Sequence, residues 1–109
     1  MAEINRGEIW QYSFPRPDKR RPVVILTRQE ILHHLSTVTI APITTTIRGI
    51  PSEVVVGTES GLKSESAINL DHVATVPKAG LRSLVGSIPD EAFLEIQQAL
   101  LFALGFDPG

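Results

Sequence analysis

The sequence predicts a small, mainly β fold in which five or six short strands are followed by one C-terminal helix. Three patterns lead to this prediction: alternation at 8–14, a continuous apolar run at 22–27, and an apolar repeat with helical spacing at 89–104. Short strands separated by turn residues favour a small, partly open barrel. With 109 residues, the chain is expected to form one domain over 1–109.

The first half of the chain is predicted to form three strands. The segment 8–14 places its three aromatic residues on one face at a spacing of two. The run at 22–27 is rich in β-branched residues and is expected to be a central strand, buried on both faces. A third strand at 37–43 alternates again, and Pro42 within it predicts a bulge or an edge position.

The middle of the second half is less regular. Residues 53–56 are predicted to form a fourth strand and 66–71 a fifth, on either side of a turn rich in small residues. The segment 73–84 contains a proline and a glycine that interrupt any pattern. We expect short connecting structure there, with a last short strand near Leu84 and Val85.

The C-terminal helix is predicted to span about 89 to 104, with a cap at Ser87 and a stop at Gly105. Its apolar residues at helical spacing are Phe93, Ile96, Leu100, Ala103 and Leu104. Leu94 and Leu101 widen this stripe beyond what one narrow contact needs. We expect part of the surplus to face a second subunit.

Composition removes several classes of protein from consideration. The chain has no cysteine, which excludes disulfides, thiolate metal sites and cysteine nucleophiles. It has no apolar stretch of eighteen residues, and its N-terminus lacks the layout of a signal peptide. We therefore expect a cytoplasmic protein without a membrane partner.

The charge is distributed unevenly along the chain. Residues 1–48 carry seven basic and four acidic residues, a net charge of +3, whereas 49–109 carry three basic and eight acidic residues, a net charge of −5. A chain with an overall charge of −2 can therefore still present a positive face, to which the segment 16–21 would contribute most. The same segment could instead be a solvated loop with scattered charge.

The common enzyme motifs are absent: there is no helical histidine pair with a carboxylate, no glycine-rich phosphate loop and no serine elbow. His33 and His34 could in principle act as general acid and base. Adjacent residues point apart in extended backbone, however, so surface histidines are the favoured interpretation.

A different pair of features lies at the ends of two predicted buried strands. Arg21 begins one strand, and the hydroxyl residues Thr44, Thr45 and Thr46 end the other. If the strands are antiparallel neighbours, a guanidinium that can bind two phosphate oxygens lies beside hydroxyl donors, which together form a phosphate clamp. The alternative is a β-favouring strand end beside an arginine that only reaches out to solvent.

At these residues the chain resembles the MazF/PemK toxin family. The matching segments follow one another in order: Arg6–Trp10, Arg21–Leu26, Ile40–Thr46, Ser66–Val73 and the terminal helix. The resemblance implies a CcdB-like or SH3-like barrel, a homodimer, and cleavage of single-stranded RNA without a metal or other cofactor. It also implies a 2′,3′-cyclic phosphate product and a MazE-like antitoxin, whose acidic segment covers the RNA groove.

By position, Arg21 resembles the family's catalytic arginine and Thr44 its catalytic threonine. We expect Arg21 to stabilise the negative charge of the transition state, and Thr44 to orient the phosphate rather than act as a base. The remaining candidates for contact with RNA are Arg16, Lys19, Arg20, Thr45, Thr46, Arg48 and His72.

Two departures from the family pattern affect the expected RNA contacts. The loop before Arg21 is shorter than in many relatives, so the basic residues of 16–20 become candidate phosphate contacts. His72 stands where relatives often carry an amide, and it could either contact a base or simply face solvent.

Two other functions remain open at this point. A CcdB-type gyrase poison shares the implied fold, and small barrels also bind RNA without cutting it. The presence of both Arg21 and Thr44 favours RNA cleavage.

Overall fold

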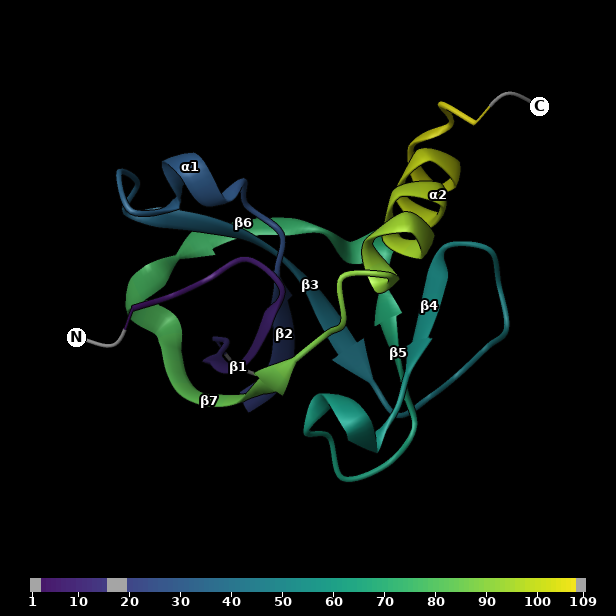
Figure 1. Ribbon diagram of the computed structural model, residues 1–109, viewed down its shortest axis with the longest axis horizontal. Coiled ribbons are helices and arrows are strands. Elements are labelled where there is room, and N and C mark those ends of the chain that lie inside the picture. Colours follow the sequence, from purple (N-terminus) through teal and green to yellow (C-terminus); the bar gives the residue numbers. More distant parts are fainter. Residues whose placement is uncertain (1–2, 16–19, 108–109) are drawn as a thin grey trace.

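The computed structural model describes residues 3–15 and 20–107 and has the expected class, an antiparallel sheet with a C-terminal helix (Figure 1). The sheet order is β4-β5-β3-β2-β1-β7, and β6 pairs with β3 as well. The strands are β1 (Glu8–Ser13), β2 (Arg20–Ile25), β3 (Thr37–Thr44), β4 (Glu53–Val56), β5 (Ser66–Asn69), β6 (Ala74–Pro77) and β7 (Leu81–Ser87). The sheet is not closed, so the prediction of a partly open, mainly β fold is confirmed.

Within residues 3–15 and 20–107, three short 3₁₀ segments and two helices accompany the strands. They are α1 (Gln29–Leu32), η1 (Thr58–Ser60), η2 (Leu70–His72), η3 (Lys78–Gly80) and α2 (Ala92–Leu104). Figure 1 places α2 beside β4 and β5, with α1 at the other end of the sheet. No helix among the described residues is long and apolar enough to cross a bilayer.

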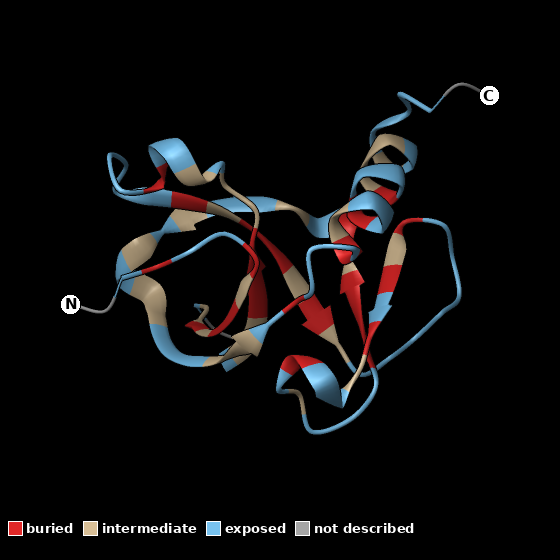
Figure 2. Ribbon diagram, viewed as in Figure 1, coloured by how far each residue is buried: buried red, intermediate tan, exposed pale blue. Residues whose placement is uncertain are grey.

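The central strand β2 separates two hydrophobic cores, because alternate side chains point to opposite faces. Figure 2 shows buried residues along β3, β4, β5 and α2. Val24 packs in the first core, with β3, β4, β5 and α2, whereas Val23 and Ile25 pack in the second, with Trp10 and Tyr12. All three β2 residues have no exposed surface. The prediction of a strand buried on both faces is confirmed.

Strand β3 changes its neighbour midway along its length. Its first half, up to Ile40, pairs with β6, and its end at Ile43 and Thr44 pairs with β5. Pro42 lies between these two ladders and is aligned with Val23 of β2 without a register shift. The interruption expected at Pro42 is therefore a change of partner strand. Proline has no backbone N–H, and at this position neither ladder needs one.

Several predicted boundaries were wrong. The fifth strand ends at Asn69 rather than 71, because 70–72 turn into η2 with the Asn69 side chain accepting the Asp71 N–H at 2.9 Å. The segment 73–84, expected to be mostly connecting structure, contains all of β6 and half of β7. The four-residue helix α1 was not expected.

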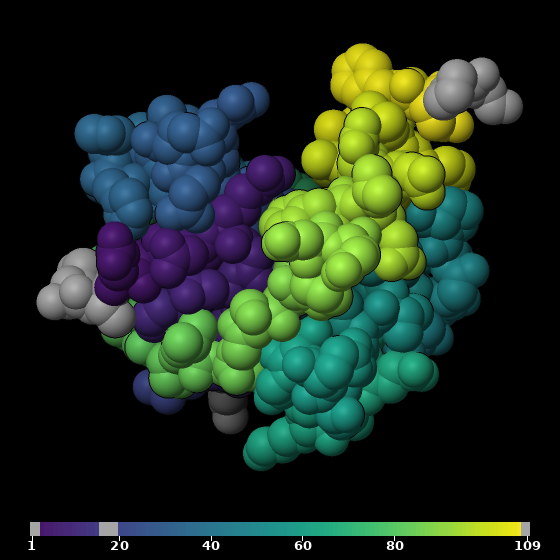
Figure 3. All heavy atoms as spheres, in the orientation of Figure 1, coloured from purple at the N-terminus to yellow at the C-terminus, as the bar shows by residue number. Residues whose placement is uncertain are grey.

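The terminal helix is shorter at its start than predicted. It begins at Ala92, after a turn in which Ala92 N–H donates to Pro89 O at 3.0 Å, and no side chain caps it. The expected stop at Gly105 is confirmed, with φ 77°. Ile96 is buried as predicted, but Leu104 is 61% exposed because the helix end extends past the body (Figure 3).

Candidate functional site

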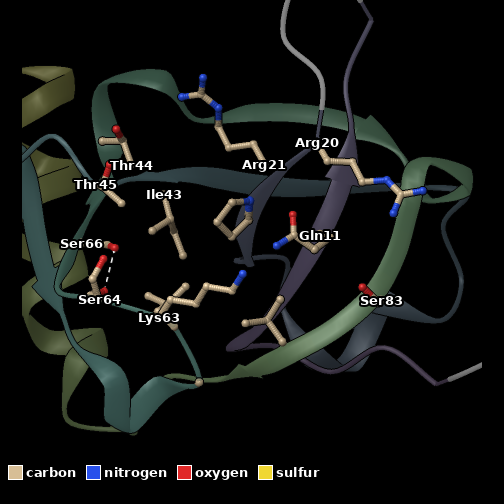
Figure 4. Close-up of a pocket in the computed structure, with 14 residues that line it drawn as sticks. Gln11, Arg20, Arg21, Ile43, Thr44, Thr45, Lys63, Ser64, Ser66 and Ser83 are labelled. Atoms are coloured by element: carbon tan, nitrogen blue, oxygen red, sulfur yellow. Dashed lines mark hydrogen bonds between the residues drawn. The ribbon is translucent and has the colours of Figure 1, made fainter.

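The strands β2 and β3 bring Arg21 and Thr44 to one face of the sheet. The ladder aligns Val23 with Pro42, and moving two residues along each strand gives Arg21 opposite Thr44. Because side chains two residues apart share a face, both project on the same side as Val23 and Pro42. Figure 4 agrees: the Arg21 guanidinium and Thr44 hydroxyl lie to one side of the strands, and Ile43 lies to the other.

A pocket of about 620 Å³, the main pocket, lies beside this pair. Its polar lining residues are Gln11, Arg20, Arg21, Thr44, Thr45, Lys63, Ser64, Ser66 and Ser83. Pro22, Ile43, Leu62 and Val85 supply apolar surface, and Gly61 completes the lining. Three strands, β1, β2 and β3, therefore form one wall, and the turn after η1 forms another.

The turn that carries Lys63 is held against β7 by two glycines. A side chain at Gly86 would meet the Ser60 carbonyl oxygen, and one at Gly61 would meet the Val85 carbonyl oxygen. Gly61 also has φ 95°, which favours glycine. This close packing fixes where Lys63 enters the pocket wall.

A smaller hollow of about 240 Å³, the side pocket, shares Arg21 with the main pocket. It is lined by Phe14, Ile40, Pro42, His72 and Ala74 in addition to Arg21. Arg21 is thus the residue common to two adjacent pockets on either side of the strand end.

A match to a protein-family model covers residues 5–104, and that family is described as the PemK-like, MazF-like toxin of a type II toxin-antitoxin system. The chain belongs to this family. The endoribonuclease MazF3 of Mycobacterium tuberculosis is 46% identical over 69 residues, which is 63% of this chain and 67% of the relative.

Solved structures agree with the family match. The M. tuberculosis toxin MazF-mt6 superposes with a TM-score of 0.85 at 36% identity, covering 92% of this chain and 98% of that one. A mycobacterial endoribonuclease in complex with its cognate antitoxin has the same TM-score of 0.85 at 25% identity, covering 98% of this chain and all of that one. The resemblance inferred from five segments is therefore confirmed.

In this MazF-type chain, Thr44 is oriented by its own strand end. The Thr46 backbone N–H donates to Thr44 Oγ1 at 3.1 Å, which uses one lone pair and leaves the hydroxyl proton available. Thr44 is half-buried and lines the main pocket, whereas Thr46 lines neither pocket.

The other predicted contact residues are divided by the fold. Arg20 and Thr45 line the main pocket, and His72 lines the side pocket. Arg48 and Thr46 line neither, and the RNA contacts of all these residues stay predictions. Arg16 and Lys19 lie outside the described residues.

The remaining histidines lie away from both pockets. His33 follows α1 and is 3.7 Å from Glu3 Oε1, and its neighbour His34 is exposed. His72, by contrast, lies at the end of η2, with its Nδ1 3.4 Å from Asn69 Nδ2. An acid-base pair formed by His33 and His34 would therefore be remote from the main pocket.

The main pocket is cationic. Arg20, Arg21 and Lys63 line it, and no carboxylate is among its described lining residues. Such a surface attracts phosphates. Among the described residues, no three histidine, aspartate or glutamate side chains are grouped so that they could hold a metal ion.

Sequence reasoning missed the residues that complete the pocket. Gln11 and Ser83 come from strands β1 and β7, and Lys63 and Ser64 come from a turn far along the chain. The alternation of β1 could have placed Gln11 opposite the aromatic face. The position of Lys63 could not have been found, because it depends on packing between the turn and β7.

Proposed function

We propose that this MazF-type chain is an endoribonuclease toxin that cuts single-stranded RNA at the junction of the main and side pockets. The observation that carries the proposal is the placement of Arg21 opposite Thr44 on one sheet face, at the rim of a pocket lined by three cations. The family match over residues 5–104 supports it.

The proposed reaction needs no external nucleophile. The ribose 2′-oxygen attacks the adjacent phosphorus and loses its proton, the bond from phosphorus to the 5′-oxygen breaks, and that oxygen takes up a proton. The products are a 2′,3′-cyclic phosphate and a 5′-hydroxyl. The transition state carries more negative charge on the phosphoryl oxygens than the substrate does, so fixed cations and hydrogen-bond donors accelerate the step.

Each of the two central residues has a role that fits its chemistry. The guanidinium of Arg21 is a cation that can donate two parallel hydrogen bonds to phosphoryl oxygens. Thr44 can donate a hydrogen bond from its hydroxyl group to the same phosphate, because its oxygen already accepts the Thr46 N–H. A free threonine hydroxyl is a poor base, so we assign it to orientation and charge stabilisation.

The two adjacent pockets suit a strand that crosses Arg21. One nucleotide would occupy the main pocket, near Arg20 and Thr45, and the next would reach the side pocket. There Phe14 and His72 offer ring surfaces for stacking.

The proposal includes partners. A relative has been solved with its cognate antitoxin, and we expect an antitoxin with an acidic segment to occupy the cationic main pocket of this chain. The exposed Leu94, 68% accessible on α2, is consistent with a homodimer contact. The expected compartment is the cytoplasm, where RNA is available.

The test is incubation of the purified protein with single-stranded RNA in excess chelator. We expect products ending in a cyclic phosphate, and we expect Arg21→Ala and Thr44→Ala each to lower the rate by about two orders of magnitude or more. Arg28→Ala and Thr37→Ala are matched controls, since both residues are exposed and line neither pocket. These controls should retain the rate.

Two outcomes would contradict the proposal. Intact RNA with bound protein would indicate a non-catalytic RNA-binding barrel, and a stabilised gyrase cleavage complex would indicate a gyrase poison. Full activity in both the Arg21 and Thr44 variants would overturn the site assignment even if RNA were cut.

A further inference from the structure

The main pocket combines apolar surface with a polar edge, as a nucleobase does. Pro22, Ile43 and Val85 provide apolar contacts, and Gln11 and Ser83 provide hydrogen-bonding groups. Single-stranded bases are recognised by stacking on their faces and by hydrogen bonds along their edges. The volume of 620 Å³ lies within the range of about 300–1,000 Å³ typical of small-molecule sites.

Gln11 is placed in this pocket by strand pairing with β2. It lies in the middle of β1 and is aligned with Pro22 of β2, whereas on the β7 side it falls within the register shift between Trp10 and Tyr12 and has no aligned partner. On the same face, Ile9 belongs to the first hydrophobic core. Gln11 therefore stands where that core gives way to the pocket, and a residue on a paired strand holds its side chain more precisely than one on a loop does.

The amide of Gln11 is directed into the pocket, near the Lys63 side chain (Figure 4). Within residues 3–15 and 20–107, no hydrogen bond joins this half-buried amide to another residue. Gln29 shows the contrast, because its amide donates to Asn5 Oδ1 at 3.1 Å and accepts the Arg6 N–H at 2.7 Å. A half-buried amide with its donors and acceptor unused is suited to a ligand that supplies the complementary groups.

We propose that Gln11 is a specificity-determining residue that reads the edge of the base next to the cleaved phosphate. The inference rests on the proposed function and deepens it, because Arg21 lines the same pocket and sets the position of that phosphate. The Gln11 amide can donate to a base carbonyl or ring nitrogen and accept from a base N–H at the same time. Lys63 is placed to bind a neighbouring phosphate, and a phosphate contact carries no information about base identity.

The experiment uses the full chain and a single-stranded RNA library of random sequence, with sequencing of the cut ends. The wild type should show a preferred base at a position adjoining the cut. Gln11→Met keeps the length of the side chain but removes its hydrogen bonds, and it should reduce the preference at that one position by about tenfold. Preferences at the other positions should be unchanged.

Gln11→Glu gives a directional readout. A carboxylate accepts hydrogen bonds but donates none, so the preferred base should change toward one that presents an N–H at that edge. Gln97→Met on α2 is the matched control, because Gln97 is exposed and lines neither pocket. It should leave every preference as in the wild type.

The outcomes separate the inference from the proposed function. If the wild type does not cut RNA, the proposed function itself fails. If the wild type cuts with a clear preference and both Gln11 variants keep it at every position, the assignment of Gln11 is overturned while the nuclease function stands. A variant that does not fold is recognised by its thermal unfolding, and the other variant then decides.

Discussion

Arg21 is positioned by strand register rather than by a local motif. It is the second residue of β2 and is aligned with Tyr12 of β1 on one side, and extending the β2–β3 register by two residues places it opposite Thr44 on the other. Pairing with β1 therefore holds the backbone from which the guanidinium projects. This is the physical reason why a residue at a strand end can be pre-organised for a transition state.

Tyr12 shows how burial changes the chemistry of a single residue. Its ring packs against Gly80, and its hydroxyl donates to Pro77 O at 3.0 Å. Burial raises the pKa of Tyr12 above its ordinary value of 10.0, and the nearby positive charge of Arg82 offsets part of that increase.

This shift predicts a component of stability that is lost in alkali. The unfolded tyrosine loses its proton at a lower pH than the folded one, so this component is present below pH 10.0 and declines as pH rises through the higher folded pKa. Denaturant unfolding above pH 10.0 should therefore show a steeper decline in the wild type than in Tyr12→Phe. Parallel declines would contradict the shifted pKa.

Among single residues, a site residue could be predicted only where the neighbouring sequence indicated its position in a strand. Arg21 and Thr44 flank strands that the sequence indicates, so their proximity could be inferred by assuming that the two strands pair antiparallel. His72 was predicted as an RNA contact without its pocket, which depends on Phe14, just after β1, and on Ile40 of β3. Gln11 was missed because a polar residue in a half-buried strand has no distinctive signal in sequence.

At the scale of elements, β3 organises the site by pairing with three strands. It joins β2 along one edge and β6 and then β5 along the other. The end of β3 beyond Pro42 therefore carries Thr44 and Thr45 away from the second core and toward the pocket. The prediction of a strand at 37–43 was correct. Its change of partner at Pro42 could not be predicted, because it depends on β6, whose residues show no clear pattern.

The contact between η1 and β7 is expected to be sensitive to glycine substitution. Gly86→Ala places a methyl group against the Ser60 carbonyl oxygen, and the backbone must move to relieve the clash. We expect destabilisation by about 1–3 kcal/mol in denaturant unfolding, as for other overpacked sites. Cleavage should also fall, because the turn carrying Lys63 shifts.

Gly105→Ala is the matched control for that prediction. Gly105 has φ 77° but nothing within 4 Å of an added methyl group, so only backbone strain of about 1 kcal/mol is expected. This variant should keep its cleavage rate. Equal effects of the two substitutions on cleavage would show that the turn does not position the pocket.

At the scale of the whole molecule, folding gathers positive side chains at one pocket although the chain is acidic overall. The chain is acidic overall, with a net charge of −2, yet the main pocket has three cations from two distant segments. The half-chain charges indicated a positive N-terminal region, but Lys63 belongs to the acidic half and joins it only through folding. Affinity for RNA should therefore depend on salt despite the acidic isoelectric point.

This dependence can be measured with a non-cleavable 2′-deoxy oligonucleotide. If the three pocket cations each bind a phosphate, the logarithm of the binding constant should fall against the logarithm of salt concentration with a slope of about −2, at about 0.7 per phosphate. Lys63→Ala should reduce the steepness by about 0.7, whereas Lys78→Ala, outside both pockets, should not change it. A slope near zero would contradict a phosphate-binding pocket.

The central claim is that Arg21 and Thr44 act on one phosphodiester, and a double-mutant cycle tests it most directly. Single-turnover cleavage rates would be measured for the wild type, Arg21→Ala, Thr44→Ala and the double variant on one RNA. Residues that act as a unit lose their effect together, so the double variant should be about as slow as the slower single variant. If instead the two losses multiply in the double variant, the residues act independently and the proposed clamp is contradicted.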